Sequence, residues 1–317
     1  MPARNLDKMF DPENIVVVGA SEKEESVEHI LLENLISRTI GEVFPVNINR
    51  KNILGKKAFS SVKEISKPID LGVIATPAET VPGIVKECGE VGIPALIIIS
   101  AGFSEVGPKG EKLEEQIEEI RENYGMRLLG PNCLGIIRPS TNLNASMADQ
   151  TPKDGSLAFI SQSGALATAT LDWAISAQFG FSSFISVGNM IDVDFGDLID
   201  YLGQDPKTHN ILLYIESIEN AERFMSAARG FARTNPVIAV KSGNYEESAQ
   251  AVVSHTGAIA GGDPAYEAAF NRAGVTRVDT MDDLFISSET LAKSELPQGP
   301  QVVIISNTGG GGNTSCR

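Results

Sequence analysis

The chain has 317 residues, of which 42% are hydrophobic and 21% are charged, so it is long enough for two domains with buried cores. Its formal net charge of −15 at pH 7 argues against a nucleic-acid-binding protein, because such proteins normally carry a basic face. The three cysteines stand far apart without a C-x-x-C pair, which excludes a disulfide framework and a zinc knuckle and fits a reducing cytosol. The N-terminus lacks the apolar segment of a signal peptide, and no stretch reaches the length of a membrane span. We therefore expect a cytoplasmic protein that does not act at a membrane.

The first part of the chain alternates short apolar runs with amphipathic segments. Runs that are apolar on both faces predict central parallel strands, and their alternation with helices predicts a doubly wound α/β sheet. The expected strands cover residues 15–18, 43–46, 71–75, 95–100 and 127–129, and the expected helices cover residues 27–37, 78–91 and 108–124. We therefore predict a Rossmann-like domain over residues 1–130.

A second α/β pattern follows residues 131–155, which are rich in Pro, Gly, Asn, Ser and Thr. This composition predicts a linker or an active loop between two domains. Beyond it, strands are expected at residues 157–160, 183–187, 211–215 and 237–240, and helices at residues 165–177, 195–202, 221–234, 264–273 and 281–291. We expect a flavodoxin-like α/β domain over residues 156–296, whose strand order the pattern leaves open.

Residues 297–317 predict the start of a third α/β unit. The apolar run 301–306 is typical of a first strand, and the glycines at 309–312 are typical of a phosphate-binding turn. A lone strand is not a stable element. We interpret the run as the first strand of an incomplete third domain, or as a strand that pairs with the second domain or a partner.

Small residues follow the first expected strand. Gly19, Ala20 and Ser21 stand where a doubly wound sheet binds an anion, because backbone N–H groups can approach a phosphate there. However, the full G-x-G-x-x-G fingerprint is absent, and Glu28, together with two other glutamates, would repel a pyrophosphate at the helix start. A nucleotide-binding turn and an ordinary strand–helix turn fit this pattern about equally well.

Further binding candidates follow the next three strands. Asn49, Arg50 and Lys51 follow the second strand, where cations can hold a terminal phosphate, although a solvated basic loop fits equally well. Ligands of open α/β sheets bind outside the carboxyl ends of the strands. The candidates for pocket walls after the third and fourth strands are Thr76, Pro77, Ala101, Gly102 and Phe103.

Ser161, Gln162, Ser163 and Gly164 follow a strand and open an apolar helix. Hydroxyl groups and free N–H groups at a helix N-terminus form a cradle for phosphate. Ser161 or Ser163 can also be an ordinary N-cap, and the two roles are compatible. The segment does not match the G-x-S-x-G elbow of the α/β-hydrolases.

His255 differs from the other two histidines because it lies in a glycine-rich segment of small residues, 253–262. A mobile imidazole is suited to act as a nucleophile, and a structural histidine is the alternative. His29, in a helix, and His209, in a turn, are expected to be structural or solvated. A nucleophilic imidazole needs a carboxylate on its other nitrogen. Glu216, at the end of a predicted strand, is the candidate, and a solvent-facing carboxylate is its alternative.

Taken together, several motifs resemble the NDP-forming acyl-CoA synthetases. The similarity is to the alpha part of ADP-forming acetate–CoA ligase, which is akin to the alpha subunit of succinyl-CoA synthetase. The motifs are, in chain order, VVVGAS, PVNIN, AGFSE, LLGPNCLGII, AFISQSGAL, SVGN with DVDFGDLIDYL, and SHTGA. GPNCLG, ISQSGA and SHTGA in this order form a highly specific signature, whereas VVVGAS alone is weak. The resemblance runs from near Met9 to about Gly310.

This resemblance implies a coenzyme A-binding first domain and a phosphohistidine-carrying second domain. Coenzyme A would contact Gly19, Ala20, Ser21, Asn49, Arg50, Lys51, Thr76, Pro77, Ala101, Gly102 and Phe103, with its thiol end beside Asn132 and Cys133. His255 would carry the phosphoryl group, Glu216 would orient it, and Ser161, Gln162, Ser163 and Gly164 would form the phosphate cradle. No metal ligand is implied in this chain.

The resemblance also implies the reaction. Acyl-CoA, ADP and phosphate would be exchanged for a small carboxylic acid, coenzyme A and ATP through a phosphohistidine. ADP or ATP with Mg²⁺ would bind to a partner, an ATP-grasp beta subunit, in a hetero-oligomer. Two features depart from the family: Glu28 stands where a glycine or small residue is usual, and the region after Thr308 ends where the family continues as a complete third domain.

Two other classes of protein compete with this interpretation. A catalytically silent acyl-CoA-sensing module, of the kind fused to acetyltransferases, tends to lose the nucleophile, whereas this chain retains His255 and Glu216. A nicotinamide dehydrogenase would need the missing glycine fingerprint and an acidic residue just after PVNIN. We therefore predict an acid–thiol ligase.

Overall fold

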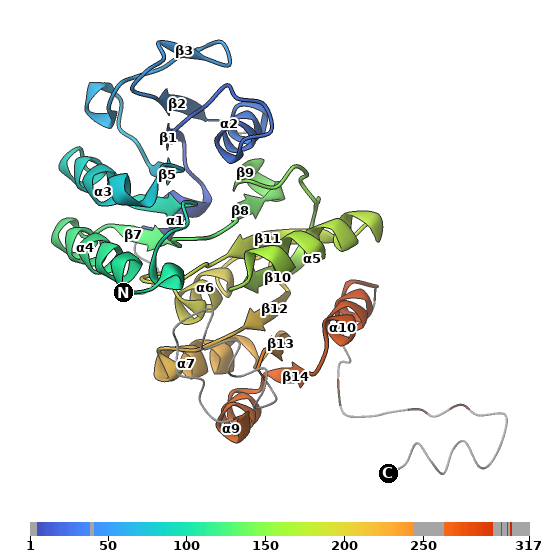
Figure 1. Ribbon diagram of the computed structural model, residues 1–317. Helices are drawn as coiled ribbons and strands as arrows, with labels where there is room; N and C mark the ends of the chain where they lie inside the picture. Colours follow the sequence, from blue (N-terminus) through green and yellow to red (C-terminus); the bar gives the residue numbers. More distant parts are fainter. Residues whose placement is uncertain are drawn as a thin grey trace.

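The computed structural model describes residues 5–38, 41–243 and 263–293, with the isolated positions 299, 303 and 305. Two large β-sheets, each flanked by helices, make up this part of the chain (Figure 1). The expected strand at 301–306 and the glycine turn at 309–312 lie outside the described residues, apart from two isolated positions.

The first sheet consists of five parallel strands. From edge to edge they are β2 (Glu42–Val46), β1 (Asn14–Val18), β5 (Leu71–Ile74), β6 (Ala95–Ile98) and β7 (Arg127–Leu129). Counted along the chain this is the order 2-1-3-4-5 of a doubly wound fold, which reverses direction between β1 and β5. Both central strands β5 and β6 are buried throughout, as their apolar sequences predict. The predicted parallel α/β architecture is confirmed.

Helices cover both faces of the first sheet. On one face, the apolar side chains of α1 (Leu6–Phe10) and α2 (Val27–Arg38) pack against the strands, and on the other face those of α3 (Val81–Glu90) and α4 (Pro108–Tyr124) do so. Helix α4 ends at Gly125, whose φ of 65° is the left-handed conformation that favours glycine after a helix. The remaining elements are the hairpin of β3 (Asn52–Ile53) and β4 (Lys56–Lys57) and the short 3₁₀ helices η1 (Val62–Glu64), η2 (Ala78–Thr80), η3 (Ser104–Val106) and η4 (Pro139–Thr141).

The second sheet has seven strands and is mixed. Its order is β14 (Thr276–Val278), β13 (Val237–Lys241), β12 (Asn210–Ile215), β10 (Lys153–Ser161), β11 (Gly180–Ser186), β8 (Gly135–Arg138) and β9 (Leu143–Ser146). The five strands from β10 to β14 are parallel and again follow the order 2-1-3-4-5, so this sheet has its own switch point between β10 and β12. The structure thus supplies the strand order of the expected flavodoxin-like domain, which the sequence pattern left open.

Helices again cover both faces. Side chains of α6 (Phe195–Leu202), α7 (Ala221–Phe231) and α9 (Asp263–Ala273) pack on one face, and those of α5 (Gly164–Ser176) and α10 (Met281–Lys293) pack on the other. The core on the first of these faces is continuous with the core under α1 and α2 of the first sheet. The two sheets therefore share one hydrophobic core.

The segment 131–155 differs from its predicted form as a linker or active loop. It contains β8 and β9, which pair antiparallel with each other and extend the second sheet beyond β11, and also the beginning of β10. Its prolines and polar residues flank the strands, while Ile136, Ile137 and Leu143 are buried. Because these strands are only four residues long, their apolar pattern was too short to outweigh the turn-forming composition.

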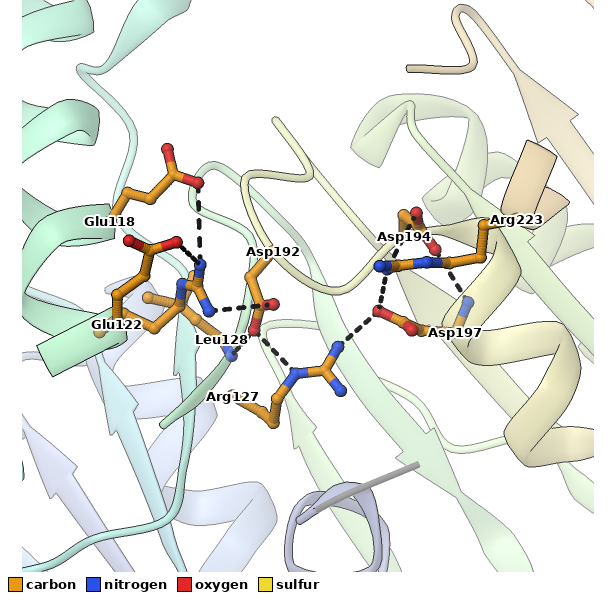
Figure 2. A network of polar contacts seen from close by, with 9 residues as sticks. Glu118, Glu122, Arg127, Leu128, Asp192, Asp194, Asp197 and Arg223 are labelled. Atoms are coloured by element: carbon orange, nitrogen blue, oxygen red, sulfur yellow. Dashed lines mark hydrogen bonds and ion pairs between the residues drawn. The ribbon is translucent and has the colours of Figure 1, made fainter. Parts of the chain in front are cut away.

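A network of ion pairs also joins the two sheets (Figure 2). Arg127, at the start of β7, contacts Asp192 through Nε at 3.0 Å and also pairs with Asp197 of α6. Asp197 in turn lies 3.1 Å from Arg223 of α7, and Asp192 lies 3.4 Å from Arg121 of α4. Since only 1% of the Asp197 side chain is exposed, these arginines compensate a charge that is removed from water.

Candidate functional site

The carboxyl-end loops of the two sheets meet at a pocket of about 690 Å³. The first sheet contributes the loops that follow β5, β6 and β7, and the second sheet contributes the loop between β10 and α5. The lining residues are Val27, Glu28, Ala75, Thr76, Pro77, Ile99, Ser100, Ala101, Asn132, Cys133, Leu134, Met147, Gln162, Ser163, Gly164, Ala165 and Thr168. We call this cavity the shared pocket. It brings together predicted site residues that are more than 80 positions apart, from Thr76 to Gly164.

A smaller pocket of about 280 Å³ adjoins the first sheet. Its walls include Gly19 after β1, Asn47 after β2, and Thr76 and Pro77 after β5. Thr76 and Pro77 line both pockets, so the loop after β5 separates the two cavities. This is the switch point of the first sheet, where such folds bind their ligands.

The turn after β1 requires glycine. Gly19 has a φ of 97°, and a Cβ atom at this position would lie 2.2 Å from the carbonyl oxygen of Ala75. Ala20 is buried, and its carbonyl oxygen accepts a hydrogen bond of 2.8 Å from Nδ2 of Asn47. Ser21 accepts a hydrogen bond from the N–H of Lys23 through its hydroxyl oxygen. The turn is thus held against the neighbouring strands, with its backbone beside the smaller pocket.

The basic segment after β2 lies at the surface. Asn49, Arg50 and Lys51 are exposed and line neither of the two pockets. The side-chain oxygen of Asn47 accepts the N–H groups of Asn49 and Arg50 at 2.7 and 3.1 Å, and Arg50 lies 3.6 Å from Glu22. The side chains could reach a ligand only from the rim.

The loop after β6 is positioned by a carboxylate. Glu105 accepts the N–H groups of Gly102 at 2.5 Å and Phe103 at 3.1 Å, and these hydrogen bonds help to lower the pKa of its carboxyl group against the effect of burial. Ala101 lines the shared pocket, whereas Phe103 is fully buried in the core under α3 and α4. The aromatic side chain therefore anchors the loop from inside the core.

Two residues after β7 complete the wall on the side of the first sheet. Asn132 has a φ of 56° and donates its backbone N–H to the carbonyl oxygen of Ser100 at 2.9 Å. The thiol of Cys133 donates to the carbonyl oxygen of Ile98 at 3.3 Å, and burial raises its pKa to about 12. The thiol is therefore protonated at neutral pH, which rules it out as a thiolate nucleophile in this state.

On the side of the second sheet, the predicted phosphate cradle lies at the switch point. Ser163 is the N-cap of α5, and its hydroxyl oxygen accepts the N–H of Leu166 at 3.3 Å, so the capping alternative is realised. The same residue lines the shared pocket with Gln162 and Gly164. Ser161 is fully buried and accepts the N–H of Ser163 at 3.1 Å. A Cβ atom on Gly164 would meet open space, so the first turn of the helix is accessible.

Glu216 follows β12, the strand across the switch point from β10. It is 9% exposed, and its backbone N–H donates to Oε1 of Gln162 at 2.6 Å. The same oxygen accepts the N–H of Ser217 at 3.0 Å. Gln162 thus holds the backbone of Glu216 next to the predicted cradle. His255 lies outside the described residues.

Asn189 connects the two sides and is not among the predicted catalytic, phosphate-binding or coenzyme A-binding residues. Its side-chain Nδ2 donates to Glu105 at 2.8 Å and to Glu114 at 2.6 Å, and its Oδ1 accepts from Asn132 at 3.2 Å. It thereby joins the second sheet to the loop that lines the shared pocket. The motif SVGN was visible in the sequence, but the contacts are between residues more than 50 positions apart.

The described residues offer no ready metal site. Within them, no three His, Cys, Asp or Glu side chains gather in a group that could hold a metal ion. Among the described helices, none is long and apolar enough to cross a membrane.

Comparisons with known proteins decide the family. A CoA binding domain model matches residues 13–139, and a succinyl-CoA ligase like flavodoxin domain model matches residues 154–291. The alpha subunit of an ADP-forming acetate–CoA ligase II from Pyrococcus furiosus is 42% identical to this chain over 97% of this chain and 67% of its own length. The chain belongs to the ADP-forming acetate–CoA ligase family. As a member, it is part of an acid–thiol ligase and corresponds to the alpha subunit.

Further relatives of this ligase chain support its assignment to the family. An ADP-forming 4-hydroxybutyrate–CoA ligase from Nitrosopumilus maritimus is 37% identical over 95% of the chain, which spans 44% of that protein. A solved dinucleotide-forming acetyl-coenzyme A synthetase 1 from Ca. Korarchaeum cryptofilum, in complex with phosphate and ADP, superposes with a TM-score of 0.92 at 36% identity, covering 98% of this chain and 67% of that one. The predicted family, fold class and enzyme class are confirmed, and the silent sensing module is not favoured.

Proposed function

We propose that this chain performs the acyl-CoA and phosphate chemistry of an ADP-forming acyl-CoA ligase. The shared pocket carries the proposal, because residues expected at the thiol end of coenzyme A face those expected to hold phosphate. Asn132 and Cys133 line it from the first sheet, and Ser163 and Gly164 line it from the second. A thioester and a phosphate bound in one cavity are held close enough to react without a diffusional encounter.

The proposal divides the chain between two tasks. Residues 1–130 bind coenzyme A, residues 156–296 carry the phosphoryl group, and residues 131–155 connect them. The thiol-bearing arm occupies the shared pocket between Thr76, Pro77 and Ala101, and the nucleotide end reaches the smaller pocket beyond the loop after β5.

The backbone turn of Gly19, Ala20 and Ser21 contacts the nucleotide end of coenzyme A. Asn49, Arg50 and Lys51 approach its phosphates from the rim. Gly102 shapes the loop after β6, and Phe103 anchors this loop in the core. Gly19 lines the smaller pocket, whose walls are largely apolar, and this supports the placement.

The chemistry proceeds in three transfers. An oxygen of inorganic phosphate attacks the thioester carbonyl carbon, the C–S bond breaks, and the thiolate of coenzyme A leaves and takes up a proton. The imidazole of His255 then attacks the phosphorus of the acyl phosphate, and the P–O bond breaks to release the carboxylate. Finally the phosphohistidine transfers its phosphoryl group to ADP, which becomes ATP.

The side chains around the cradle have distinct roles in these steps. The N–H groups at the start of α5 stabilise the charge on the phosphate oxygens, with Ser161 and Ser163 holding the turn. Glu216 orients His255 and supports the imidazolium that forms. Gln162 keeps the backbone of Glu216 in place.

The nucleotide step needs a partner. We assign ADP and Mg²⁺ to an ATP-grasp beta subunit, because the relatives named as alpha subunits belong to a multi-subunit enzyme. The second substrate is a small carboxylic acid, and the assembly is a hetero-oligomer. We also place the protein in the cytoplasm, which fits the buried free thiols of Cys88 and Cys133.

Phosphohistidine labelling tests the proposal. The chain is incubated with its beta subunit and [γ-³²P]ATP, and the protein-bound label is tested for the acid lability and base stability of a phosphoimidazole. His255→Ala is expected to abolish the label. Glu216→Gln is expected to reduce the labelling rate at least about a hundredfold, because the imidazolium loses its carboxylate.

His209→Ala is the matched control, since His209 is exposed and lies in the loop between α6 and β12. It should leave the label intact. Label that persists in His255→Ala, or that is lost in His209→Ala alone, would reject the assignment.

A further inference from the structure

A buried lysine lies at the carboxyl end of β13, outside the lining of the shared pocket. Only 3% of Lys241 is exposed. Within the described part of the chain, its Nζ donates to the carbonyl oxygen of Ser242 and lies 4.7 Å from the centroid of the Tyr266 ring, and no carboxylate forms an ion pair with it. Burial lowers the pKa of this lysine. Because a charge removed from water in this way costs stability, its presence points to a role beyond packing.

Tyr266, on α9, connects this lysine to the loop after β12. Its hydroxyl oxygen accepts the N–H of Ile218 at 3.2 Å. Its ring also packs against the ring of Phe270, which is buried in the core, with 6.0 Å between the two centroids. A cation over an aromatic face is attracted by the ring, and the attraction is stronger where water is excluded. Lys241 therefore holds the orientation of the ring whose hydroxyl group binds Ile218.

Side chains hold the loop after β12 at three successive N–H groups. Oε1 of Gln162 accepts those of Glu216 and Ser217 at 2.6 and 3.0 Å, and the Tyr266 hydroxyl accepts that of Ile218. Gln162 belongs to the predicted phosphate cradle, whereas Tyr266 belongs to α9. Two separate elements thus fix the loop that begins with the predicted orienting carboxylate.

We propose that Lys241 and Tyr266 are positioning residues for the phosphoryl transfer: the ammonium group orients the ring, and the hydroxyl group of the ring holds the loop that carries Glu216. This inference rests on the proposed function and adds two residues to it. Neither residue lines the shared pocket, so neither is assigned a contact with coenzyme A or phosphate. A displaced loop would misalign the carboxylate and slow the transfer without weakening the binding of coenzyme A.

A double-mutant cycle tests whether the two residues act in series. Tyr266→Phe keeps the ring and removes only the hydroxyl group, and Lys241→Met keeps an unbranched side chain and removes the charge. Each variant is assembled with its beta subunit and given acetyl-CoA and ³²P-labelled phosphate, which label the protein through the first two transfers of the proposed reaction. The readout is the rate at which acid-labile, base-stable label forms.

Each single variant should label about tenfold more slowly than the wild type. In the Tyr266→Phe background, Lys241→Met should lower the rate by less than about a further twofold, because the hydroxyl group through which the ammonium acts is already absent. Dissociation constants for coenzyme A, from isothermal titration, should stay within about twofold of the wild type. Lys241→Met should not unfold at a lower guanidinium concentration, since it removes a buried charge.

Two variants serve as matched controls. Tyr201→Phe removes the hydroxyl group of a half-buried tyrosine on α6, and Lys207→Met removes the charge of an exposed lysine in the loop between α6 and β12. Both should label at the wild-type rate.

A wild-type labelling rate in either Lys241→Met or Tyr266→Phe would overturn the inference, and so would losses that multiply in the double variant. A loss of coenzyme A binding as large as the loss of rate would also overturn it, because the two residues would then support the fold as a whole. If the folded wild-type complex forms no such label, the proposed function itself fails, which is a distinct result.

Discussion

At the residue scale, the site depends on side chains that hold backbone loops in place. Gln162 binds two N–H groups after β12, Glu105 binds two after β6, and Asn189 connects the latter loop to Asn132. These three residues can affect activity through the loops that they position, without contacting a substrate. A misplaced loop at such a site reduces activity because reacting groups must be aligned within a fraction of an ångström.

Gly19 provides a test of this rigidity. Gly19→Ala would place a Cβ atom 2.2 Å from the carbonyl oxygen of Ala75 at a φ of 97°. We expect it to lower the free energy of unfolding by about 3 kcal/mol and to weaken coenzyme A binding. Guanidinium denaturation gives the first quantity, and isothermal titration gives the second.

Gly83→Ala is the control for that change. Gly83 lies in α3, where an added Cβ atom meets nothing within 4 Å. Because alanine favours helix over glycine, this variant should be more stable than the wild type by about 0.5–1 kcal/mol. A Gly19→Ala variant as stable as the wild type would show that the turn after β1 is not constrained.

At the element scale, the ion-pair network in Figure 2 joins β7 to α6 and α7. Arg127 and Arg223 both contact Asp197, but the side chain of Arg127 is 12% exposed and that of Arg223 is 42% exposed. Arg127→Ala should lower the free energy of unfolding by about 3 kcal/mol, because it leaves the buried Asp197 carboxylate undercompensated. Arg223→Ala should cost less than about 1 kcal/mol, because its charge is largely in water.

Denaturation of the two arginine variants under the same conditions makes this comparison direct. Equal losses in both would mean that burial does not set the strength of these pairs.

The elements that the sequence predicted best are those with a strong local signal. The buried strands β1, β5, β6 and β12 and the second half of β10 have mostly apolar sequences. Loops such as Ser161–Gly164 could be placed because ligands bind at the carboxyl ends of parallel strands. The strands β8, β9 and β14 are three or four residues long and gain their stability from neighbours far along the chain. The local sequence contains no pattern that predicts such pairing. The contacts of Asn189 with Glu105, Glu114 and Asn132 could not be predicted for the same reason.

At the scale of the whole molecule, the two doubly wound sheets both contribute loops from the carboxyl ends of their strands to one cavity. The continuous core under α1, α2, α6 and α7 fixes this arrangement, and Gly188 permits it, since a Cβ atom there would lie 2.1 Å from the carbonyl oxygen of Pro131. The sequence predicted each unit and its candidate residues separately. Their meeting at the shared pocket depends on packing between the sheets, which periodicity within either unit does not encode.

A crystal structure of the chain with coenzyme A and phosphate would show whether the two ligands share one cavity. We predict that the sulfur lies beside Asn132 and Cys133 and that the phosphate lies on the N–H groups at the start of α5, so that both occupy the shared pocket. If the sulfur and the phosphate bind in separate cavities, with the walls of the shared pocket between them, the proposed reaction at this pocket is wrong.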